Sequence, residues 1–501
     1  MMENFENLLH GFSIAISGYH IFLMIAGVMM GLLVGVLPGL GAPNGVTLLL
    51  PLTFSMEPVS AIILLTSMYW GALFGGSTTS ILFNIPGEPS SVATTFDGHP
   101  MAKRGETTEA LTYAFSSAGI GALCGVALIT VLSSWIASFA LSFSPAEYFA
   151  VYFLAFSCFI GFGSGSMLKS AAVIALGFAL TSVGMDTVSG EVRLTYGFSE
   201  LLRGISFLVA VIGLFGIGEL LLTMEEDLKF DSVKSKLEIR RVFKTIATLP
   251  RYWATYLRSL AIGCWMGITP GGPTAASFMS YGVAQRSGKK KFGTGIPEGI
   301  IAPETADHAA GSSAILPMLA LGIPGSATAA VMMGGLLIWG LNPGPMLFVQ
   351  NTDFVWGLIA SMYLGNVIGV IFALATVPFF AVILRVRFAI VAPLIMFVCL
   401  IGAYTVASAS FDMVLLAIFG VVGYLFKKLD YPIAPFVLAM VLGQKAEDAF
   451  RQSLMISQGS LSVFFSNWLV GSVMTAGIAM IAIPALIALW RRRRPSLVEE
   501  V

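Results

Sequence analysis

The sequence predicts an all-α polytopic membrane protein made of two inverted repeats of transmembrane helices, each with a broken or re-entrant hairpin that carries Pro-Gly motifs. Three observations predict this class: composition, interrupted apolar segments and internal repetition. The chain has 501 residues, of which 56% are hydrophobic and 11% are charged, and its mean hydropathy is +0.87. Soluble globular proteins carry about 25% charged residues. A net charge of zero argues against nucleic-acid binding.

The apolar segments are long enough to cross a bilayer, which requires about 20 residues per helix. They predict spans over 12–37, 59–83, 110–141, 147–163, 170–184, 202–223, 388–406 and 411–426. A charged segment with eight Lys and Arg residues separates the two halves. Because basic residues favour the cytoplasm, we expect a first membrane repeat over 1–224, a cytoplasmic linker over 225–258, a second membrane repeat over 259–490 and a cytoplasmic tail over 491–501.

Two segments rich in proline and glycine interrupt the apolar sequence. Gly35–Gly45 holds two prolines and four glycines, and a similar break lies at Gly267–Ser277. Such sequence does not continue a helix. Irregular backbone at membrane depth is tolerated only where protein buries it or where it lines a wet cavity. Paired breaks in the two halves therefore indicate a transport site.

The second half repeats motifs of the first in the same order. The matched pairs are Pro38-Gly39 with Pro270-Gly271, Ile85-Pro-Gly87 with Ile323-Pro-Gly325, Ser117-x-x-x-Gly121-x-x-x-Gly125 with Ser361-x-x-x-Gly365-x-x-x-Gly369, and Cys158-Phe-Ile-Gly161 with Cys399-Leu-Ile-Gly402. Basic residues bracket 388–426 but not the matching segment 147–184, which predicts opposite sidedness and hence inversion. The apolar insertion Pro432–Gly443 predicts an additional crossing or dip that returns the C-terminus to the cytoplasm.

Small, hydroxyl and amide residues follow each break. A helix that begins inside the membrane directs free amides at the break, which suits a carboxylate, whereas carbonyl, hydroxyl and amide oxygens suit Na⁺. Tight packing of small residues between spans is the alternative interpretation. The predicted substrate- or ion-binding residues are Pro38, Gly39, Gly41, Asn44, Ser77, Thr78, Thr79, Asn84, Pro86, Gly87, Pro270, Gly271, Gly272, Thr274, Ser277, Ser312, Ser313, Pro324, Gly325 and Ser326.

Ionisable residues after the second break have two interpretations. Asp307 and His308 are candidates for proton or ion handling. Nearby basic residues favour a solvated loop for Glu298 and Glu304, and Asp97-Gly-His-Pro100 is typical of a turn with a satisfied histidine. The cysteines and histidines show no metal-binding motif, and we expect no catalytic residue and no cofactor beyond the coupling ion.

At these residues the sequence resembles the large membrane subunit of the tripartite tricarboxylate transporters, the TctA family, over nearly its whole length. The motifs that carry the resemblance include Val36-Leu-Pro-Gly-Leu-Gly41, Gly75-Gly-Ser-Thr-Thr-Ser-Ile-Leu82, Asn84-Ile-Pro-Gly-Glu88, Asp97-Gly-His-Pro-Met101, Ala302-Pro-Glu304 and Leu321-Gly-Ile-Pro-Gly-Ser326. The chain departs from the family pattern at Asp307-His308 and Ser312-Ser313, where members often have Asn and Gly.

The resemblance implies a multi-pass protein of the bacterial inner membrane, with a small four-span TctB-like subunit and a periplasmic TctC-like solute-binding protein as partners. It implies uptake of organic carboxylates of the tricarboxylate and dicarboxylate class, and analogy suggests an elevator-like motion. The chain has no P-loop for ATP, so symport with Na⁺ or H⁺ is expected. The alternatives are a carboxylate carrier or channel that needs no binding protein and, more remotely, an intramembrane hydrolase that uses Asp307, His308 and Ser312 or Ser313.

Overall fold

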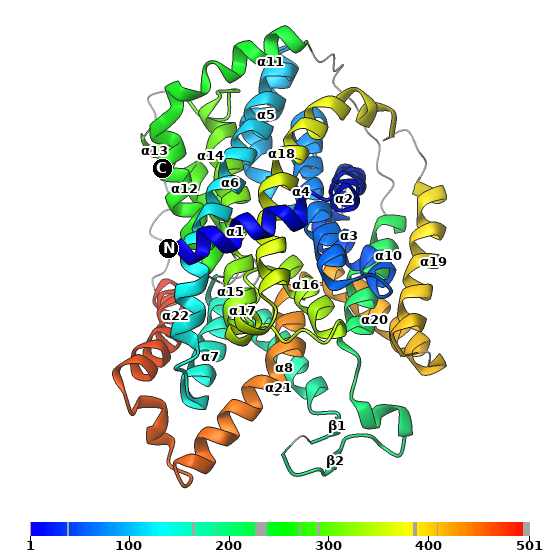
Figure 1. Cartoon of the computed structure of the whole chain (residues 1–501), viewed down its shortest axis with the longest axis vertical. Helices are drawn as coiled ribbons and strands as arrows, with labels where there is room; N and C mark the ends of the chain where they lie inside the picture. Colours follow the sequence, from blue (N-terminus) through cyan, green and yellow to red (C-terminus); the bar gives the residue numbers. More distant parts are fainter. Residues whose placement is uncertain are drawn as a thin grey trace. The chain divides into compact units, whose positions relative to one another are not determined.

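The computed structural model is almost entirely helical, and its elements are labelled in Figure 1. Among the described residues, seven helices are long and apolar enough to cross a membrane, and one two-stranded sheet forms. The predicted all-α membrane class is therefore confirmed. The structure describes residues 2–37, 40–162, 166–186, 188–225, 238–269, 272–287, 291–383, 388–407 and 409–493.

The chain divides into two compact units, and each is made of two chain segments. Unit 1 comprises Met1–Leu141 and Ser206–Leu429, and unit 2 comprises Ser142–Ile205 and Asp430–Val501. This division into units does not test the two predicted repeats, and their inversion stays a prediction.

Unit 1 contains most of the helices. Its first segment holds α1 (Met2–Ala15), α2 (Gly18–Val36), α3 (Gly41–Leu49), α4 (Pro58–Phe83), the short 3₁₀ turns η1 (Leu50–Thr53) and η2 (Pro89–Ser91), α5 (Val92–Lys103) and α6 (Thr107–Ala140). Its second segment holds α9 (Phe207–Val211), a π-helical stretch η4 (Ile212–Ile217), α10 (Gly218–Glu225), α11 (Ile239–Ile246), η5 (Leu249–Tyr252), α12 (Trp253–Ile268), α13 (Gly272–Ser287), α14 (Glu298–Ser313), α15 (Ile315–Leu321), α16 (Ala327–Ile338), α17 (Pro345–Gln350), α18 (Thr352–Ile383), α19 (Phe388–Ala407) and α20 (Ser410–Lys428).

Helices α4 and α14 form the centre of unit 1 and are buried on all sides. Helix α2 packs closely along α4 because small residues line the contact. A Cβ atom on Gly31 would collide with the carbonyl of Met68, and one on Gly35 would collide with the carbonyl of Ala72. On the other half, Gly263 of α12 lies against Ala306 of α14. Each central helix is therefore held by a partner helix that ends at a predicted break.

The two long helices α6 and α18 each pack on the central helix of the other half. Gly121 of α6 faces the carbonyl of Thr305 in α14, and Gly125 of α6 faces Ser312. Gly369 of α18 faces the ring of Phe74 in α4. The matched Gly-x-x-x-Gly motifs thus make matched contacts, with the halves exchanged.

One local expectation for unit 1 was wrong. Asp97-Gly-His-Pro100 lies inside helix α5 and not in a turn, although His99 is satisfied as expected, because its Nδ1 lies 3.0 Å from the carbonyl oxygen of Ile81. The charged segment 225–258 is partly helical, since it contains α11 and the beginning of α12. Helix α11 packs on α6, where Arg241 forms a 3.5 Å ion pair with Glu109.

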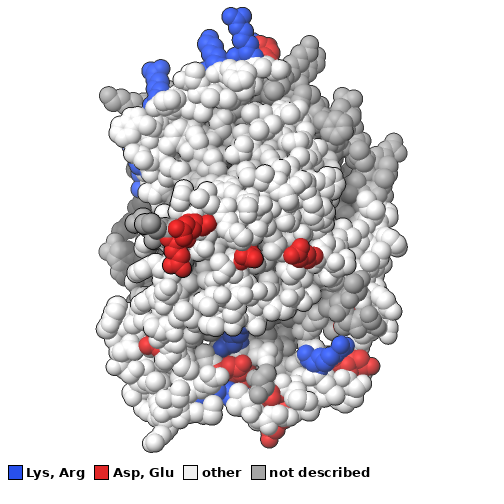
Figure 2. Space-filling view, viewed as in Figure 1, with Lys and Arg blue, Asp and Glu red and all other residues white. Residues whose placement is uncertain are grey.

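The surface of unit 1 is mostly uncharged on the face shown in Figure 2, and basic side chains gather over α11. Apolar side chains stand exposed on the long helices, including Trp265 on α12, Val367 and Ile371 on α18 and Ile418 on α20. Exposed apolar faces of this extent suit contact with lipid and would be a liability in water.

Unit 2 contains α7 (Pro145–Phe162), α8 (Met167–Thr181), strands β1 (Gly184–Met185) and β2 (Val192–Arg193), η3 (Ser199–Arg203), α21 (Ile433–Ile456), η6 (Leu461–Phe465) and α22 (Trp468–Arg493). The predicted crossing or dip at Pro432–Gly443 forms the first half of α21, which packs on α7 and α8. The strands pair antiparallel, with Gly184 opposite Arg193.

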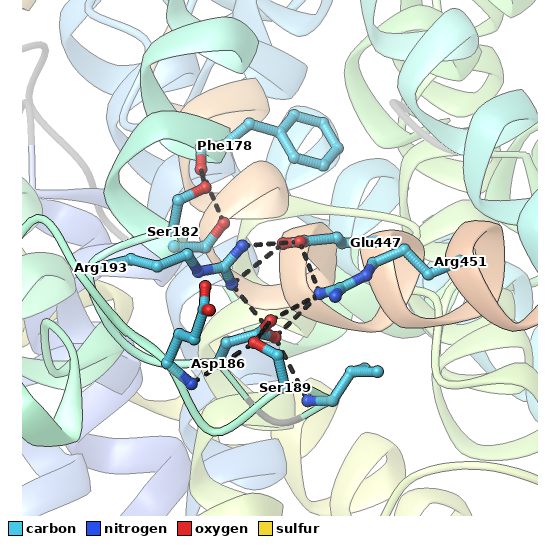
Figure 3. Close-up of polar contacts among 10 residues, drawn as sticks. Phe178, Ser182, Asp186, Ser189, Arg193, Glu447 and Arg451 are labelled. Atoms are coloured by element: carbon cyan, nitrogen blue, oxygen red, sulfur yellow. Dashed lines mark hydrogen bonds and ion pairs between the residues drawn. The ribbon is translucent and has the colours of Figure 1, made fainter.

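A network of four charged side chains ties the β-hairpin to α21 within unit 2 (Figure 3). Arg451 donates to both carboxylate oxygens of Asp186, at 2.8 and 2.9 Å, and Arg193 donates to Glu447 at 2.8 Å. Ser189 donates to Asp186 at 2.5 Å. The hydrogen bonds from Ser189 and Arg451 lower the pKa of the buried Asp186 carboxyl. The hairpin is thus fixed by charge, because its apolar side chains are largely exposed.

Candidate functional site

Helices are interrupted at both predicted breaks. Helix α2 ends at Val36 and α3 begins at Gly41, while α12 ends at Ile268 and α13 begins at Gly272. Gly41 has φ +55°, a left-handed conformation that favours glycine. The predicted residues Pro38, Gly39, Pro270 and Gly271 lie outside the described residues.

The two Ile-Pro-Gly motifs lie against the helices that precede the breaks. A Cβ on Gly87 would meet the carbonyl oxygen of Gly35, one residue before the end of α2. A Cβ on Gly325 would meet the carbonyl oxygen of Gly267, one residue before the end of α12. The sequence repeat therefore has the same packing role in the two halves, and both glycines are needed for close approach of backbone.

The amino end of α3 already binds a carboxylate of the chain itself. The backbone amide of Ala42 donates to Glu88 Oε1, and the backbone amide of Ser91 donates to the same side chain in a capping box. A carboxylate is favoured at such a position by the free amides and by the positive end of the helix dipole. The first break thus holds the carboxyl group of Glu88 on a free amide of α3.

Ionisable side chains from both halves meet beside this position, and we call Glu88, Glu304, Asp307 and His308 the acid cluster. Asp307 lies close enough to Glu304 and Glu88 for their charges to act on it. His308 Nδ1 lies 3.7 Å from Glu304 Oε2 and 3.2 Å from the carbonyl oxygen of Glu304. Among the described residues, no lysine or arginine forms an ion pair with a member of the acid cluster.

Glu304 joins the two halves of unit 1. Ser77 of α4 donates to Glu304 Oε2 at 2.8 Å, and Thr94 of α5 donates to Glu304 Oε1 at 2.6 Å. Glu304 is 1% exposed, so the expectation of a solvated loop was wrong. Glu298, at the first turn of α14, is half-buried. The nearby basic residues suggested solvent, but α14 runs into the core of unit 1, where hydroxyl groups replace water as partners of Glu304.

Asp307 and His308 are 3% and 0% exposed, and each has a polar atom without a hydrogen-bond partner among the described residues. These atoms are Asp307 Oδ1 and His308 Nε2. Ser90 lies next to Asp307, but the Ser90 hydroxyl also reaches no partner in this part of the chain. The ring of His308 packs on Phe74 with 4.9 Å between centroids. Buried polar atoms of this kind are costly unless a ligand satisfies them.

The structure brings some predicted residues to the acid cluster and uses others in local contacts. Ser77 contacts Glu304, and Ser326, which caps α16, lies next to Tyr69, on which the charges of Glu88 and Asp307 also act. The hydroxyls of Thr78, Thr79 and Ser313 donate to carbonyls of their own helices. Asn44, Ser277 and Ser312 are buried. Gly272 begins α13, and Thr274 is half-buried in the same helix. Asn84 is the exposed left-handed cap of α4, and Pro86 and Pro324 belong to the Ile-Pro-Gly motifs.

Sequence reasoning missed four residues of the site, which are Tyr69, Glu88, Ser90 and Thr94. One signal was present for Glu88, and another was present for Glu304, which was assigned to a solvated loop. Glu88 directly follows the first Ile-Pro-Gly motif. Glu304, Asp307 and His308 have the i, i+3, i+4 spacing that places them on one face of a helix. A prediction of helix for α14 would have placed these three side chains on one face.

The interrupted helices, the apolar spans and the buried ionisable groups together define a multi-pass membrane protein with a polar centre, the arrangement found in membrane transport proteins. A sequence comparison identifies the family. The model of the tripartite tricarboxylate transporter TctA family matches residues 21–438, and the chain belongs to this family.

Two relatives in Agrobacterium vitis are uncharacterized and add no activity. An uncharacterized 52.8 kDa protein in the TAR-I ttuC' 3'region is 34% identical over 503 residues, which is 100% of both chains. An uncharacterized protein in the TAR-II ttuC' 3'region is 32% identical over 241 residues, which covers 48% of this chain and 100% of that protein. No solved structure matches.

Proposed function

We propose that this chain is the large membrane subunit of a binding-protein-dependent secondary transporter that imports organic carboxylates of the di- and tricarboxylate class into the bacterial cell. Its partners are a small four-span TctB-like subunit and a periplasmic TctC-like solute-binding protein, and its location is the inner membrane. A Na⁺ or H⁺ gradient supplies the driving force, and the chain itself catalyses no chemical reaction.

The observation that carries this proposal is the carboxylate seated at the first break. Ala42 presents its amide to Glu88 where helix α3 begins inside the apolar core of unit 1. A substrate carboxylate has the same shape and charge as the glutamate side chain, so the same amide suits it when Glu88 moves away. The site needs no lysine or arginine for this, because the helix amides supply the positive end of a dipole.

The hydrolase alternative receives no support from the contacts of its proposed residues. Ser313 donates to the carbonyl of Ala309. In the described part of the chain, no hydrogen bond joins His308 to Ser312 or Ser313, whereas a serine nucleophile needs a base within hydrogen-bond reach.

The test is transport by the complete complex in proteoliposomes. The chain is reconstituted with its two partners, and uptake of labelled citrate and succinate is measured under an imposed Na⁺ or pH gradient. We expect accumulation that ends when both gradients are collapsed. Uptake that persists without either gradient and requires ATP would overturn the proposal. Full uptake in the absence of the binding protein would favour the independent carrier or channel.

A glycine pair adds a structural control to this test. Gly41→Val places a β-branched residue at a left-handed position at the start of α3, and we expect it to abolish uptake. Gly282→Ala adds a methyl group with nothing within 4 Å and should leave uptake unchanged. Equal uptake by both variants would show that the start of α3 has no part in transport.

A further inference from the structure

The three carboxyl groups of the acid cluster differ in the donors that they receive. Glu88 accepts from the backbone amides of Ala42 and Ser91. Glu304 accepts from the hydroxyls of Ser77 and Thr94. Asp307 Oδ1 accepts from none of the described residues, and the Ser90 hydroxyl is the donor group that lies beside the Asp307 carboxyl. Donors stabilise the ionised form of a carboxyl group, so the carboxyl group with the fewest donors is the first to take up a proton.

The charges that surround Asp307 act in the same direction. Glu304 stands one turn earlier on α14, and Glu88 faces Asp307 from the segment before η2. The phenol of Tyr69 faces it from α4. Several other titratable groups on the helices packed against α14 are engaged elsewhere. Asp97 of α5 accepts from the 293–296 loop, and His99 contacts the Ile81 carbonyl. Tyr113 of α6 bonds to Thr248, Tyr256 of α12 to Ser117 and Tyr281 of α13 to Asp97.

Three negative charges in one buried cluster without a basic partner are strongly unfavourable, because each loses hydration and repels the others. Glu88 and Glu304 have donors that favour their ionised forms, so Asp307 is the group that gives up its charge first. We propose that Asp307 binds the coupling proton of transport, with the carboxylates of Glu304 and Glu88 attracting it. This inference rests on the proposed function and names the ion and the residue that the proposed function leaves open.

The geometry at Asp307 suits a proton. A proton needs one lone pair, and the unpartnered Oδ1 of Asp307 offers it. Within the described residues, no group of three or more His, Cys, Asp and Glu side chains is arranged to hold a metal ion. With His308 Nδ1 protonated toward the Glu304 carbonyl, His308 Nε2 offers a second lone pair on the same helix.

The first experiment reads the proton without any substrate. Difference infrared spectroscopy on the purified complex records the carbonyl stretch of protonated carboxylic acids between neutral and alkaline pH. We expect a band in the wild type that is missing in Asp307→Asn. It should persist in the matched control Glu298→Gln, which alters a half-buried carboxyl at the start of the same helix. A wild-type protein without the band at neutral pH would overturn the proposal, and so would a band that persists in Asp307→Asn.

The second experiment uses the same complexes in proteoliposomes loaded with citrate or succinate. Asp307→Asn should lose accumulation driven by a pH gradient, by at least tenfold, while exchange of labelled for unlabelled carboxylate continues without a gradient. A merely structural role would reduce both activities together and would overturn the assignment. Size-exclusion profiles of the variants establish that the complexes are folded.

The outcomes separate this inference from the proposed function. Accumulation driven by a Na⁺ gradient but not by a pH gradient would overturn the proton site and leave carboxylate transport intact. A band that disappears in Asp307→Asn, with no carboxylate transported by the wild type, would support the proton site and overturn the proposed function.

Discussion

Asp97 is expected to be the most consequential single contact between the two halves of unit 1, and its replacement by alanine tests how α14 is held in place. Its carboxylate is 0% exposed. It accepts from the backbone amides of Gly295 at 2.8 Å and Ile296 at 3.0 Å and from the hydroxyl of Tyr281 at 2.9 Å. The amide of Gly293 lies 3.0 Å from both carboxylate oxygens. These donors come from α13 and from the loop that leads into α14.

The magnitude follows from what Asp97→Ala leaves behind. A buried donor without an acceptor costs about 1–3 kcal/mol. The Gly295 amide and the Tyr281 hydroxyl are buried in these hydrogen bonds, while the amides of Gly293 and Ile296 are partly buried and lose less because water reaches them. We therefore expect a loss of about 3–5 kcal/mol in the free energy of unfolding. Asp97→Asn retains one acceptor oxygen and should lose less.

The assay is thermal unfolding of the purified protein in detergent, with Asp353→Ala as the matched control. Asp353 pairs with His10 at 3.1 Å, and its side chain is 74% exposed, so its removal should change the free energy by about 0–1 kcal/mol. Asp97→Ala should lower the unfolding midpoint by several degrees and abolish transport, because α14 carries Glu304 and Asp307. Equal midpoints for Asp97→Ala and Asp353→Ala would refute the reasoning.

Three further predictions follow from other contacts. Gly87→Val should lose about 1–3 kcal/mol by overpacking against the Gly35 carbonyl, as measured by the unfolding midpoint; a midpoint equal to that of the wild type would contradict the close approach. Glu88→Ala should cost about 1–3 kcal/mol because the Ala42 amide loses its acceptor, and Glu88→Gln should cost less in the same assay. In unit 2, the pKa of Asp186 is lowered by its contacts. These contacts therefore stabilise the folded state fully at pH values above the ordinary aspartate pKa of about 3.9, and this stabilisation is lost only as the pH falls below that value. Hydrogen exchange of the β-hairpin amides should therefore show equal protection at pH 7 and pH 5, and faster exchange at both in Arg451→Gln.

The fold class could be predicted from the sequence because the bilayer imposes strong rules on composition. Apolar length and the low content of charge identified the long helices, and the prolines and glycines around Gly41 and Gly272 identified the helix interruptions. These signals are local in the chain. The division into two units was not predicted, since it depends on which helices pack together.

The acid cluster was predicted only in part because its partners are distant in sequence. The sequence neighbours of Glu304 indicate a surface residue, although its side chain is buried. Its donors Ser77 and Thr94 lie 227 and 210 residues away. The hydroxyls of Thr78 and Thr79 belong to the same motif as Ser77, yet they bond within their own helix. The side of α4 on which each hydroxyl falls decides its role, and that side is known only when the packing of α4 is known.

The crossed contacts of α6 and α18 make the halves mutually dependent. A polypeptide cut within the connecting segment would yield two fragments. In one, α4 would lack its contact with α18, and in the other, α14 would lack its contact with α6. The central helix of each half depends on the long helix of the other half. A cut in the connecting segment would therefore leave both cores incomplete until the two fragments associate again.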